Sequence, residues 1–514
     1  LLYKKNPEKS RWVRRMAKTG VPLPSRNRLW RVLDKEELEI IDTAAYKVLK
    51  DVGVFIDDNE LLKMAEEMGC SVNYETKIVT DIPEHVVREQ VRKAPRSFLL
   101  AGRDPEWDVE VEGPARRQYW APESGATDVL VWDEKGKKYY RRRASSKDTL
   151  YAAKIVDGID DFDVNVYIYD AAEEGHQGLP SELNKMNAML QGTTKWAGHL
   201  CTTVSTIEEY DYVEKLAAEV AGGEEELRKR PLFWTVYNYI GTLQLNRFNS
   251  WLFRASVKYH WPIMPAVTAA APLMGPAMAA GNAAISHAGL LFMIALKQFH
   301  DPGVAAVPNN IVFSLDPMTG RGGAHVPHFM LGTCAMNQLW HELYGLPTAQ
   351  YGGTFAASLD QQAFNLARYM ALQIISGTDF IFEQCGGEAF DPALIPICAE
   401  IARMGRTLMS TFHQIYPTPE NLALDVTKEV GAKGEKWMTH KYNLDRLKMF
   451  PSGFCLDTDA FDTWLGKGAR SWVYDLCREK LKELEKHEPK PLPKDVVERM
   501  NAIVKEGNEK LRVR

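Results

Sequence analysis

The sequence predicts an α/β fold, a (β/α)8 TIM barrel with N-terminal helical and β-meander additions and a C-terminal helical tail. Its 514 residues are enough for one large barrel with extensions. Short apolar runs alternate with longer amphipathic segments through the middle of the chain, as in βα units. Most runs are apolar on both faces, which is typical of buried parallel strands. A doubly wound sheet is the alternative, but no G-x-G-x-x-G follows the first run.

The predicted barrel strands are short runs rich in β-branched and aromatic residues, each followed by a polar or glycine-bearing loop. An eighth strand cannot be placed from the sequence. The seven runs are 162–170, 195–204, 231–239, 262–269, 303–310, 346–353 and 379–387.

The clearest helix is expected over 360–376, where apolar residues recur at helical spacing and form one stripe. Asp360 is the expected N-cap and Gly377 the expected stop. Similar patterns predict helices over 325–344, 248–260 and 393–413.

The flanks divide the chain further. We expect an N-terminal helical region over 1–107, a β-meander over 108–145, the barrel over 146–450 and a C-terminal helical extension over 451–514. Within the meander, "TDVLVWDEKGKKYY" predicts a hairpin that turns at Lys135-Gly136.

Composition excludes several classes. A formal net charge of −5 gives no general argument for nucleic-acid binding. The basic start lacks the apolar segment of a secretory signal. The stretch 261–296 has no charged residue, but prolines interrupt its first half, so we interpret it as protein core and not as a membrane span. The seven cysteines show no CxxC spacing, which favours reduced thiols in a cytoplasmic protein.

In a TIM barrel, functional residues follow the C-terminal ends of the strands. Here those ends are rich in aromatic and amide side chains and poor in carboxylates. Aromatic faces beside a carboxylate are typical of a site for a quaternary ammonium group, although core packing is the commoner role of any one ring. The predicted cage comprises Tyr119, Trp120, Tyr169, Tyr237, Tyr351 and Phe355, with Glu383 as the carboxylate.

Other chemistries have weaker support. Asp170, His199 and Glu383 could supply ligands to a catalytic metal, but no H-x-H or H-E-x-x-H spacing is present. No G-x-S-x-G sequence marks a serine nucleophile.

Several stretches together resemble the trimethylamine:corrinoid methyltransferase family. They are "YWAPESGATDVLVWD", "APLMGPAMAAGNA", "LWHELYGLPTAQYGGTFAASLDQQAF" and "IFEQCGGE", and the likeness runs from about Leu33 to the end. The resemblance implies a TIM barrel that moves a methyl group from an N-methylated amine to Co(I) of a corrinoid (cobalamin), which a separate protein carries.

The founding trimethylamine enzymes carry pyrrolysine in the loop after the sixth strand. This chain has Gly353-Thr354-Phe355-Ala356-Ala357-Ser358 there, with Asp360-x-Gln362 following, and Ser358 lies roughly at the pyrrolysine position. The chain therefore looks like the members without pyrrolysine, which resemble glycine-betaine methyltransferases. A quaternary amine is already cationic and leaves as a neutral tertiary amine, so it needs only to be positioned and kept from water.

We therefore expect methyl transfer from glycine betaine or a related betaine to a cognate corrinoid-binding protein. We expect no tightly bound metal, no nucleic-acid or membrane partner, and a homo-oligomer. The catalytic candidates are Glu383 and His199, and the substrate-binding candidates are Tyr119, Trp120, Tyr169, Tyr237, Asn238, Tyr351 and Phe355. A substrate carboxylate could pair with Arg321, Lys195, His199 or Asn238. The alternatives are a metal-dependent barrel hydrolase or lyase, and a non-catalytic member that binds an amine or a corrinoid protein.

Overall fold

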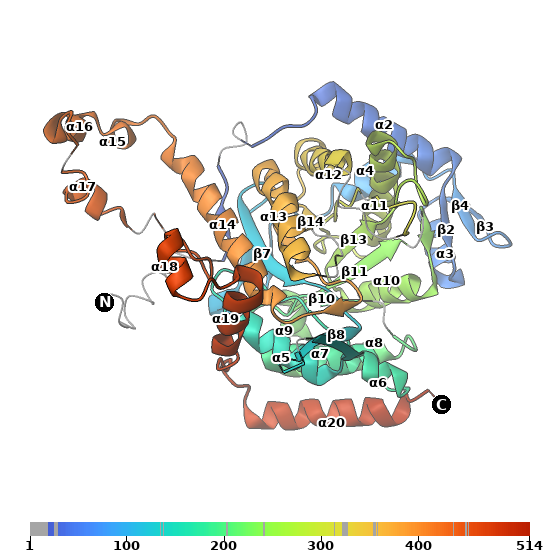
Figure 1. The fold of residues 1–514 in the computed structure, drawn as a ribbon. Coiled ribbons are helices and arrows are strands. Elements are labelled where there is room, and N and C mark those ends of the chain that lie inside the picture. Colours follow the sequence, from blue (N-terminus) through green and yellow to red (C-terminus); the bar gives the residue numbers. More distant parts are fainter. Residues whose placement is uncertain are drawn as a thin grey trace.

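The structure is a computed structural model with a mixed α/β fold, in which strands lie at the centre and helices surround them (Figure 1). The described residues are 19–24, 29–133, 135–136, 138–201, 204–239, 242–312, 314–320, 327–352, 356, 358–434, 436–447, 450 and 452–513.

Two sheets with parallel pairing form the centre of the molecule. One has the order β1-β7-β15-β14, in which only β1 runs antiparallel, and the other has the order β10-β11-β13. Their bounds are β1 Val21–Pro22, β7 Arg117–Glu123, β10 His199–Leu200, β11 Trp234–Tyr239, β13 Ile263–Val267, β14 Ala349–Gly352 and β15 Phe380–Gln384.

The described strands form these separate sheets and do not close into one cylinder. Isolated parallel bridges extend them, because Ala266 pairs with Asn309, and Asn309 pairs with Ala349. On the other side, the main-chain N–H of Asp163 donates to the carbonyl of Trp120, and that of Asn165 donates to the carbonyl of Trp196.

Strand β7 lies in the range expected to form the meander, yet it pairs in parallel with β15 over five residues from Phe380↔Tyr119 to Gln384↔Glu123. The sequence reasoning did not count 117–123 among the barrel strands. The pairing places the C-terminal end of β7 beside the C-terminal end of β15.

Five of the predicted runs contain a strand, which confirms them: 195–204, 231–239, 262–269, 346–353 and 379–387 contain β10, β11, β13, β14 and β15. The runs 162–170 and 303–310 differ, because they contribute isolated bridges at Tyr169, Ala306 and Asn309 and no full strand.

The predicted helices are present. Helix α13 (Leu359–Ser376) ends at Gly377, whose φ of 80° is left-handed. It begins one residue before the predicted N-cap, so Asp360 lies in its first turn and Ser358 is the N-cap.

Helix α11 (Ala279–His300) is apolar and long enough to span a membrane, but 78% of its most apolar window is buried in the protein, as predicted for a core segment. The other helices around the sheets are α5 Ser146–Asp157, α6 Ala172–His176, α7 Ser181–Gly192, α8 Glu209–Ala221, α9 Glu224–Lys229, α10 Arg247–Tyr259, α12 Pro327–Leu339 with the π-helical turn η3 Trp340–Tyr344, and α14 Leu394–Gln414.

The described part of the N-terminal flank combines helices with short strands. Its elements are α2 Lys35–Asp51, β2 Val54–Ile56, α3 Asn59–Glu67, β3 Ser71–Asn73, β4 Ile78–Thr80, α4 Glu84–Val91, β5 Phe98–Leu100, η2 Pro105–Trp107 and β6 Val109–Val111. The predicted hairpin is also present as β8 (Asp128–Asp133) and β9 (Lys138–Arg143), and β16 (Ala389–Phe390) pairs with β8. Strand β12 (Gln244–Leu245) pairs with β2.

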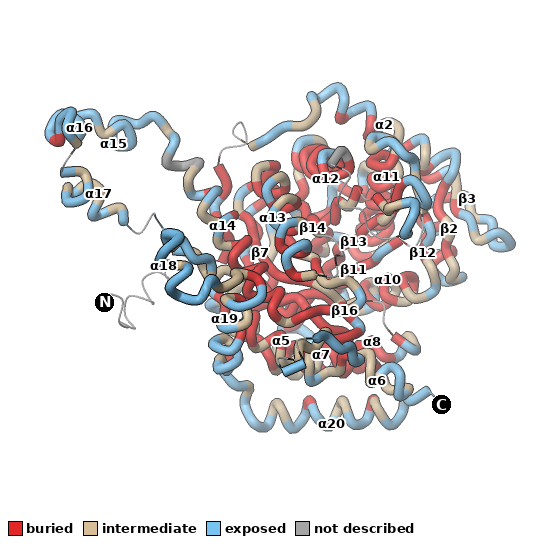
Figure 2. Tube along the Cα trace, in the orientation of Figure 1, coloured by how far each residue is buried: buried red, intermediate tan, exposed pale blue. Residues whose placement is uncertain are grey.

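The C-terminal part is helical and partly extended away from the body (Figure 1). Its elements are α15 Pro419–Leu422, α16 Leu424–Val430, α17 Lys441–Leu444, α18 Phe461–Gly466, η5 Trp472–Leu476, α19 Cys477–Leu484 and α20 Lys494–Lys510. Figure 2 shows that burial is concentrated in the central strands and the helices packed on them, whereas α15–α18 are mostly exposed.

Asp379 joins three parts of the core just before β15. Its carboxylate accepts hydrogen bonds from the main-chain N–H of Ala115 at 2.7 Å and of Thr348 at 2.9 Å, and it lies 2.7 Å from Nε2 of His341. Its carbonyl also accepts from the N–H of Tyr119. This buried carboxylate therefore holds β7 and β14 in place on either side of β15.

We expect Asp379→Asn to destabilise the protein by about 2–4 kcal/mol, because the new amide group would face donors where the carboxylate accepted. Thermal unfolding followed by circular dichroism measures the effect. Asp495→Asn, on the exposed face of α20, is the control and should leave the melting temperature unchanged. Equal melting temperatures for wild type and Asp379→Asn would contradict the role of Asp379.

Candidate active site

A buried carboxylate at the C-terminal end of β7 meets a buried imidazole of β10. Oε1 of Glu123, the last residue of β7, lies 3.2 Å from Nδ1 of His199, the first residue of β10. Glu123 is 5% exposed and His199 is 1% exposed, so bulk water screens the interaction between the two side chains only weakly. The pair is the polar centre of the candidate site.

Aromatic rings surround His199. Its ring centroid lies 4.6 Å from that of Phe382, 5.6 Å from that of Trp234, and 6.2 Å from those of Trp196 and Tyr351. The hydroxyl of Tyr351 lies 3.5 Å from Nδ1 of His199. These rings form one apolar cluster with Tyr119 and Phe380.

Strand geometry explains why these side chains meet. Successive side chains of a strand point to opposite faces, and register aligns the strands side by side. Tyr351 pairs with Phe382, and Phe382 pairs with Ala121, so Tyr351 and Phe382 lie in one layer across the strands. The pair Gln384↔Glu123 lies two residues further along, in the next layer toward the C-terminal ends. Glu123 therefore shares the inner face with Tyr119 and lies closer to the strand ends.

Several polar atoms at this end are buried without a hydrogen-bond partner. They include Oε2 of Glu123, Nε2 of His199 and both side-chain amide atoms of Asn309. Burial, followed by the charge of Glu123, raises the pKa of Tyr351 well above its ordinary value, while the Asn309 amide acts in the opposite direction. Buried polar atoms are usually paired, so this group has the capacity to bind a polar ligand.

A second polar cluster lies next to the first. The Nζ of Lys185 is 3.0 Å from Asp170 and 2.9 Å from Glu182, and it lies 3.8 Å from the ring centroid of Tyr167. The hydroxyl of Tyr167 contacts the sulfur of Cys201 at 2.9 Å. Lys185 is completely buried, and two carboxylates compensate its charge. Its ammonium group is therefore already paired within this cluster.

The structure brings together only part of the predicted cage. His199 and Tyr351 belong to the cluster, and Tyr119 lies deeper in it, where its ring stacks on Phe380 and its hydroxyl donates to the carbonyl of Glu110. Asn238 is exposed at the end of β11. Phe355 lies outside the described residues.

Four predicted residues point to the surrounding layers. The ring of Trp120 faces α14, where a Cβ on Gly405 would come within 2.4 Å of it. Tyr169 donates to the carbonyl of Phe390. Tyr237 accepts a hydrogen bond from the hydroxyl of Thr235 and packs on Phe253 of α10. The fourth residue is Glu383.

Glu383 is a buried carboxylate of a different kind. It occupies the face of β15 opposite to Phe382, and both its oxygens lack a hydrogen-bond partner. Burial raises its pKa well above the ordinary value, and the neighbouring Cys398 thiol of α14 acts in the same direction. Burial in this environment disfavours the ionised form of the carboxyl.

The proposed metal ligands are not gathered. Asp170 pairs with Lys185, His199 with Glu123, and Glu383 faces α14. Among the residues that the structure describes, no group of three or more His, Cys, Asp or Glu side chains could hold a metal ion. Lys195 is also committed elsewhere, since its Nζ donates to the carbonyls of Val156 and Ile159 and burial lowers its pKa to about 8. Arg321 lies outside the described residues.

Sequence reasoning missed Glu123, Trp196, Trp234 and Phe382. A signal for Glu123 was available, because a lone carboxylate ends the apolar stretch "YWAPE", as Glu383 ends "FIFE". Assigning 108–145 to a peripheral meander hid this similarity.

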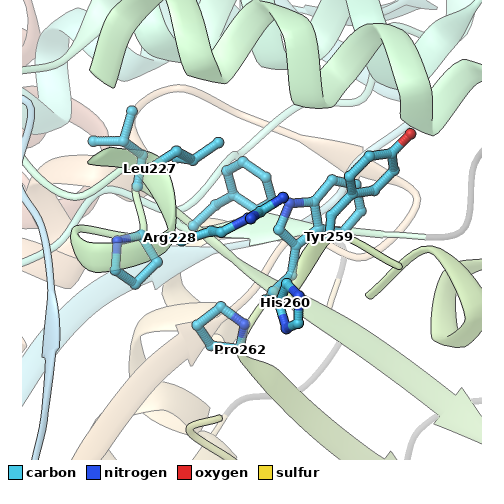
Figure 3. A pocket seen from close by; sticks show the side chains of 9 residues that line it. Leu227, Arg228, Tyr259, His260 and Pro262 are labelled. Atoms are coloured by element: carbon cyan, nitrogen blue, oxygen red, sulfur yellow. The ribbon is translucent and has the colours of Figure 1, made fainter. Parts of the chain in front are cut away.

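Two cavities lie away from this cluster, in addition to a third beside Cys455. One, of about 10 Å³, is lined by the residues before β11 and β13, including Tyr259, His260 and Pro262, so it lies at the opposite ends of these strands (Figure 3). It has room for about one water molecule. The other, of about 490 Å³, is lined by Tyr169, Asp391 and Arg478 between the β8–β9 hairpin and α19.

The chemistry of these groups suits a compact cation. Glu123 is the acidic group of this cluster, and the rings supply π faces that attract an ammonium group without needing N–H donors. Quaternary ammonium groups satisfy both requirements.

Comparisons with known proteins extend over nearly the whole chain. The trimethylamine methyltransferase MttB of Desulfitobacterium hafniense is 27% identical over 489 residues, covering 92% of this chain and 93% of that protein. A glycine betaine methyltransferase of the same species is 22% identical over 454 residues, covering 87% and 90%. The crystal structure of the Methanosarcina barkeri monomethylamine methyltransferase MtmB is similar at a TM-score of 0.46 and 11% identity, covering 93% of this chain and 97% of that one.

The sequence profile of one family spans residues 4–511. The chain belongs to the trimethylamine methyltransferase (MTTB) family.

Proposed function

We propose that the protein transfers a methyl group from a quaternary amine, glycine betaine or a related betaine, to Co(I) of a corrinoid carried by a separate protein. The observation that carries the proposal is the buried Glu123 carboxylate, which has a free oxygen beside His199 and lies among aromatic rings. A buried negative charge is costly without a cation nearby, so the site favours a ligand that brings one.

We further propose that the two parallel sheets belong to one (β/α)8 barrel. Two segments between the sheets support this. Residues 305–310 form bridges to both β13 and β14. Residues 163–169 occupy the same position between β7 and β10, because they hydrogen-bond to the carbonyls of Trp120 in β7 and of Trp196 just before β10. In such a barrel, Glu123 and Tyr351 lie toward the C-terminal mouth, where barrel enzymes bind their substrates, and the His199 ring contacts both of them.

The proposed reaction balances without a proton. The C–N bond to one methyl group breaks, its electron pair stays on nitrogen, and the amine leaves as a neutral tertiary amine. The Co(I) electron pair forms the new bond to carbon, so cobalt is formally oxidised to Co(III). The protein positions the ammonium against Glu123 and the rings, aims one methyl outward to the partner, and excludes water.

The loop after β14 supports a quaternary substrate. The resemblance places a pyrrolysine of the trimethylamine enzymes near Ser358, and no lysine or pyrrolysine occurs between Gly352 and Gln362. An amine that is already cationic does not require an additional activating group, which is consistent with this loop.

The substrate assignment predicts a selectivity. Purified protein supplied with Co(I)-cobalamin should consume Co(I) with glycine betaine, carnitine or choline as the methyl donor, and not with trimethylamine. Loss of Co(I) absorbance in anaerobic ultraviolet–visible spectra measures the reaction. Turnover of trimethylamine alone would refute the assignment to quaternary amines.

Glu123→Gln should lower kcat/KM for the quaternary amine by about 100-fold or more, because the substitution keeps the shape and removes the compensating charge. The matched control is Glu383→Gln on the other face of the neighbouring strand, which should stay within about twofold of wild type. Steady-state Co(I) consumption measures both variants. A larger loss for Glu383→Gln than for Glu123→Gln would instead support the sequence-based choice of Glu383.

The raised pKa of Glu383 also predicts a pH effect on stability. The pKa of Glu383 in the folded protein lies above its ordinary value of 4.5. The contribution of Glu383 to the free energy of unfolding is therefore complete below pH 4.5 and is lost as the pH rises. Glu383→Gln cannot ionise, so its melting temperature relative to wild type should increase from about pH 5 to about pH 8. Differential scanning calorimetry at both values tests this, and a constant difference would contradict a neutral Glu383.

A further inference from the structure

Two cysteines far from the candidate site lie in contact. The sulfur of Cys455 is 3.4 Å from the sulfur of Cys477, the first residue of α19. All seven cysteines are free.

The two thiols have different access. Cys455 is partly exposed and lines a cavity of about 380 Å³, together with Trp464, Arg470 and Lys480. Cys477 is buried behind it. A small reagent in the cavity therefore reaches Cys455 first.

The surroundings of Cys455 favour its thiolate. The thiol of Cys477 hydrogen-bonds to it and lowers its pKa, and the indole N–H of Trp472 donates to the same sulfur at 3.2 Å and acts in the same direction. Burial and the Glu400 carboxylate act in the opposite direction, and the net effect is a lowered pKa of Cys455. The hydrogen bond to Cys455 and burial both raise the pKa of Cys477. Cys455 is thus the more nucleophilic member of the pair.

The backbone holds Cys455 in this position. The carboxylate of Glu400 on α14 accepts from the main-chain N–H of Cys455 at 2.7 Å and of Leu456 at 2.9 Å. Cations at the cavity are already paired, because Lys467 bonds to Asp459 and Arg470 bonds to Glu479. The cavity therefore favours a small neutral reagent over a charged one.

We propose that Cys455 and Cys477 form a reversible disulfide when a hydroperoxide enters this cavity. The Cys455 thiolate attacks one peroxide oxygen, the O–O bond breaks, and the leaving oxygen departs as hydroxide, which gives a sulfenic acid. The sulfur of Cys477 then attacks the sulfur of Cys455. The S–O bond breaks, and the proton of Cys477 leaves with the hydroxyl as water. Two thiols are oxidised to one disulfide and one hydroperoxide is reduced.

The disulfide would close a segment that contacts helix α13. Helix α18 and the turn η5 lie between the two cysteines, and the hydroxyl of Tyr474 in η5 donates to Asp360 at 3.1 Å. Asp360 lies in the first turn of α13, directly after the loop that follows β14. In Figure 1, α18 and α19 lie beside α14 on the side of the body that also carries α13. Oxidation would therefore tie this contact in place.

The test is disulfide mapping of the full chain by peptide mass spectrometry during a hydrogen peroxide titration. We expect a Cys455–Cys477 cross-link that dithiothreitol reverses, and alkylation of reduced Cys455 by iodoacetamide at least about tenfold faster than that of Cys385. In Cys477→Ser, Cys455 should accumulate as a sulfenic acid that dimedone traps.

A second thiol pair provides the control. Cys385 and Cys398 lie 3.7 Å apart and are both completely buried, so they should remain reduced at peroxide concentrations that oxidise Cys455. Cys385→Ser should leave the Cys455–Cys477 cross-link unchanged. Free Cys455 and Cys477 after the titration, direct conversion of Cys455 to sulfinic acid in the wild type, or earlier oxidation of Cys385 would overturn the proposal.

Discussion

The parallel pairing of β7 with β15 is the constraint on which the rest of the site depends. It aligns Glu123 with Gln384 and so carries a carboxylate to the C-terminal ends of the central strands, within 3.2 Å of His199. Two buried aspartates hold the strand from its other end. Asp379 accepts from the N–H of Ala115, and Asp163 accepts from the N–H of Trp120 at 3.0 Å. A shift of one residue in this register would turn Glu123 to the helical layer and Trp120 inward.

Glu123 and Glu383 show how position decides the chemistry of a buried carboxylate. Both end apolar strands that are neighbours in the same sheet, and both have at least one oxygen without a hydrogen-bond partner. Glu383 lies against α14 and a thiol, where burial raises its pKa and makes the neutral acid the stable form. Glu123 lies beside an imidazole and aromatic faces, surroundings in which an ionised carboxylate and a bound cation stabilise each other.

The contrast between Glu123 and Glu383 also shows which features of the structure the sequence could predict. Apolar runs and helical periodicity located β11, β13, β14, β15 and helices such as α13, because both patterns depend on local spacing. The sequence also pointed to the strand ends, and two of the residues chosen there, His199 and Tyr351, belong to the site, although His199 begins its strand. Which face a residue occupies is a matter of register and pairing with distant segments, so Tyr237 was chosen in place of its neighbours on the inner face, and Glu383 in place of Phe382. The role of β7 was missed because its partner is more than 250 residues away.

The central claim is that a quaternary ammonium binds between Glu123 and the rings around His199. A crystal structure of the protein with bound glycine betaine tests this most directly. The account predicts the ammonium within about 6 Å of the ring centroids of Trp234, Phe382 or Tyr351, with the carboxylate of Glu123 as its nearest negative charge. Density for the betaine on the outer face of β15 beside Glu383, or in the cavity lined by Tyr169, would contradict it.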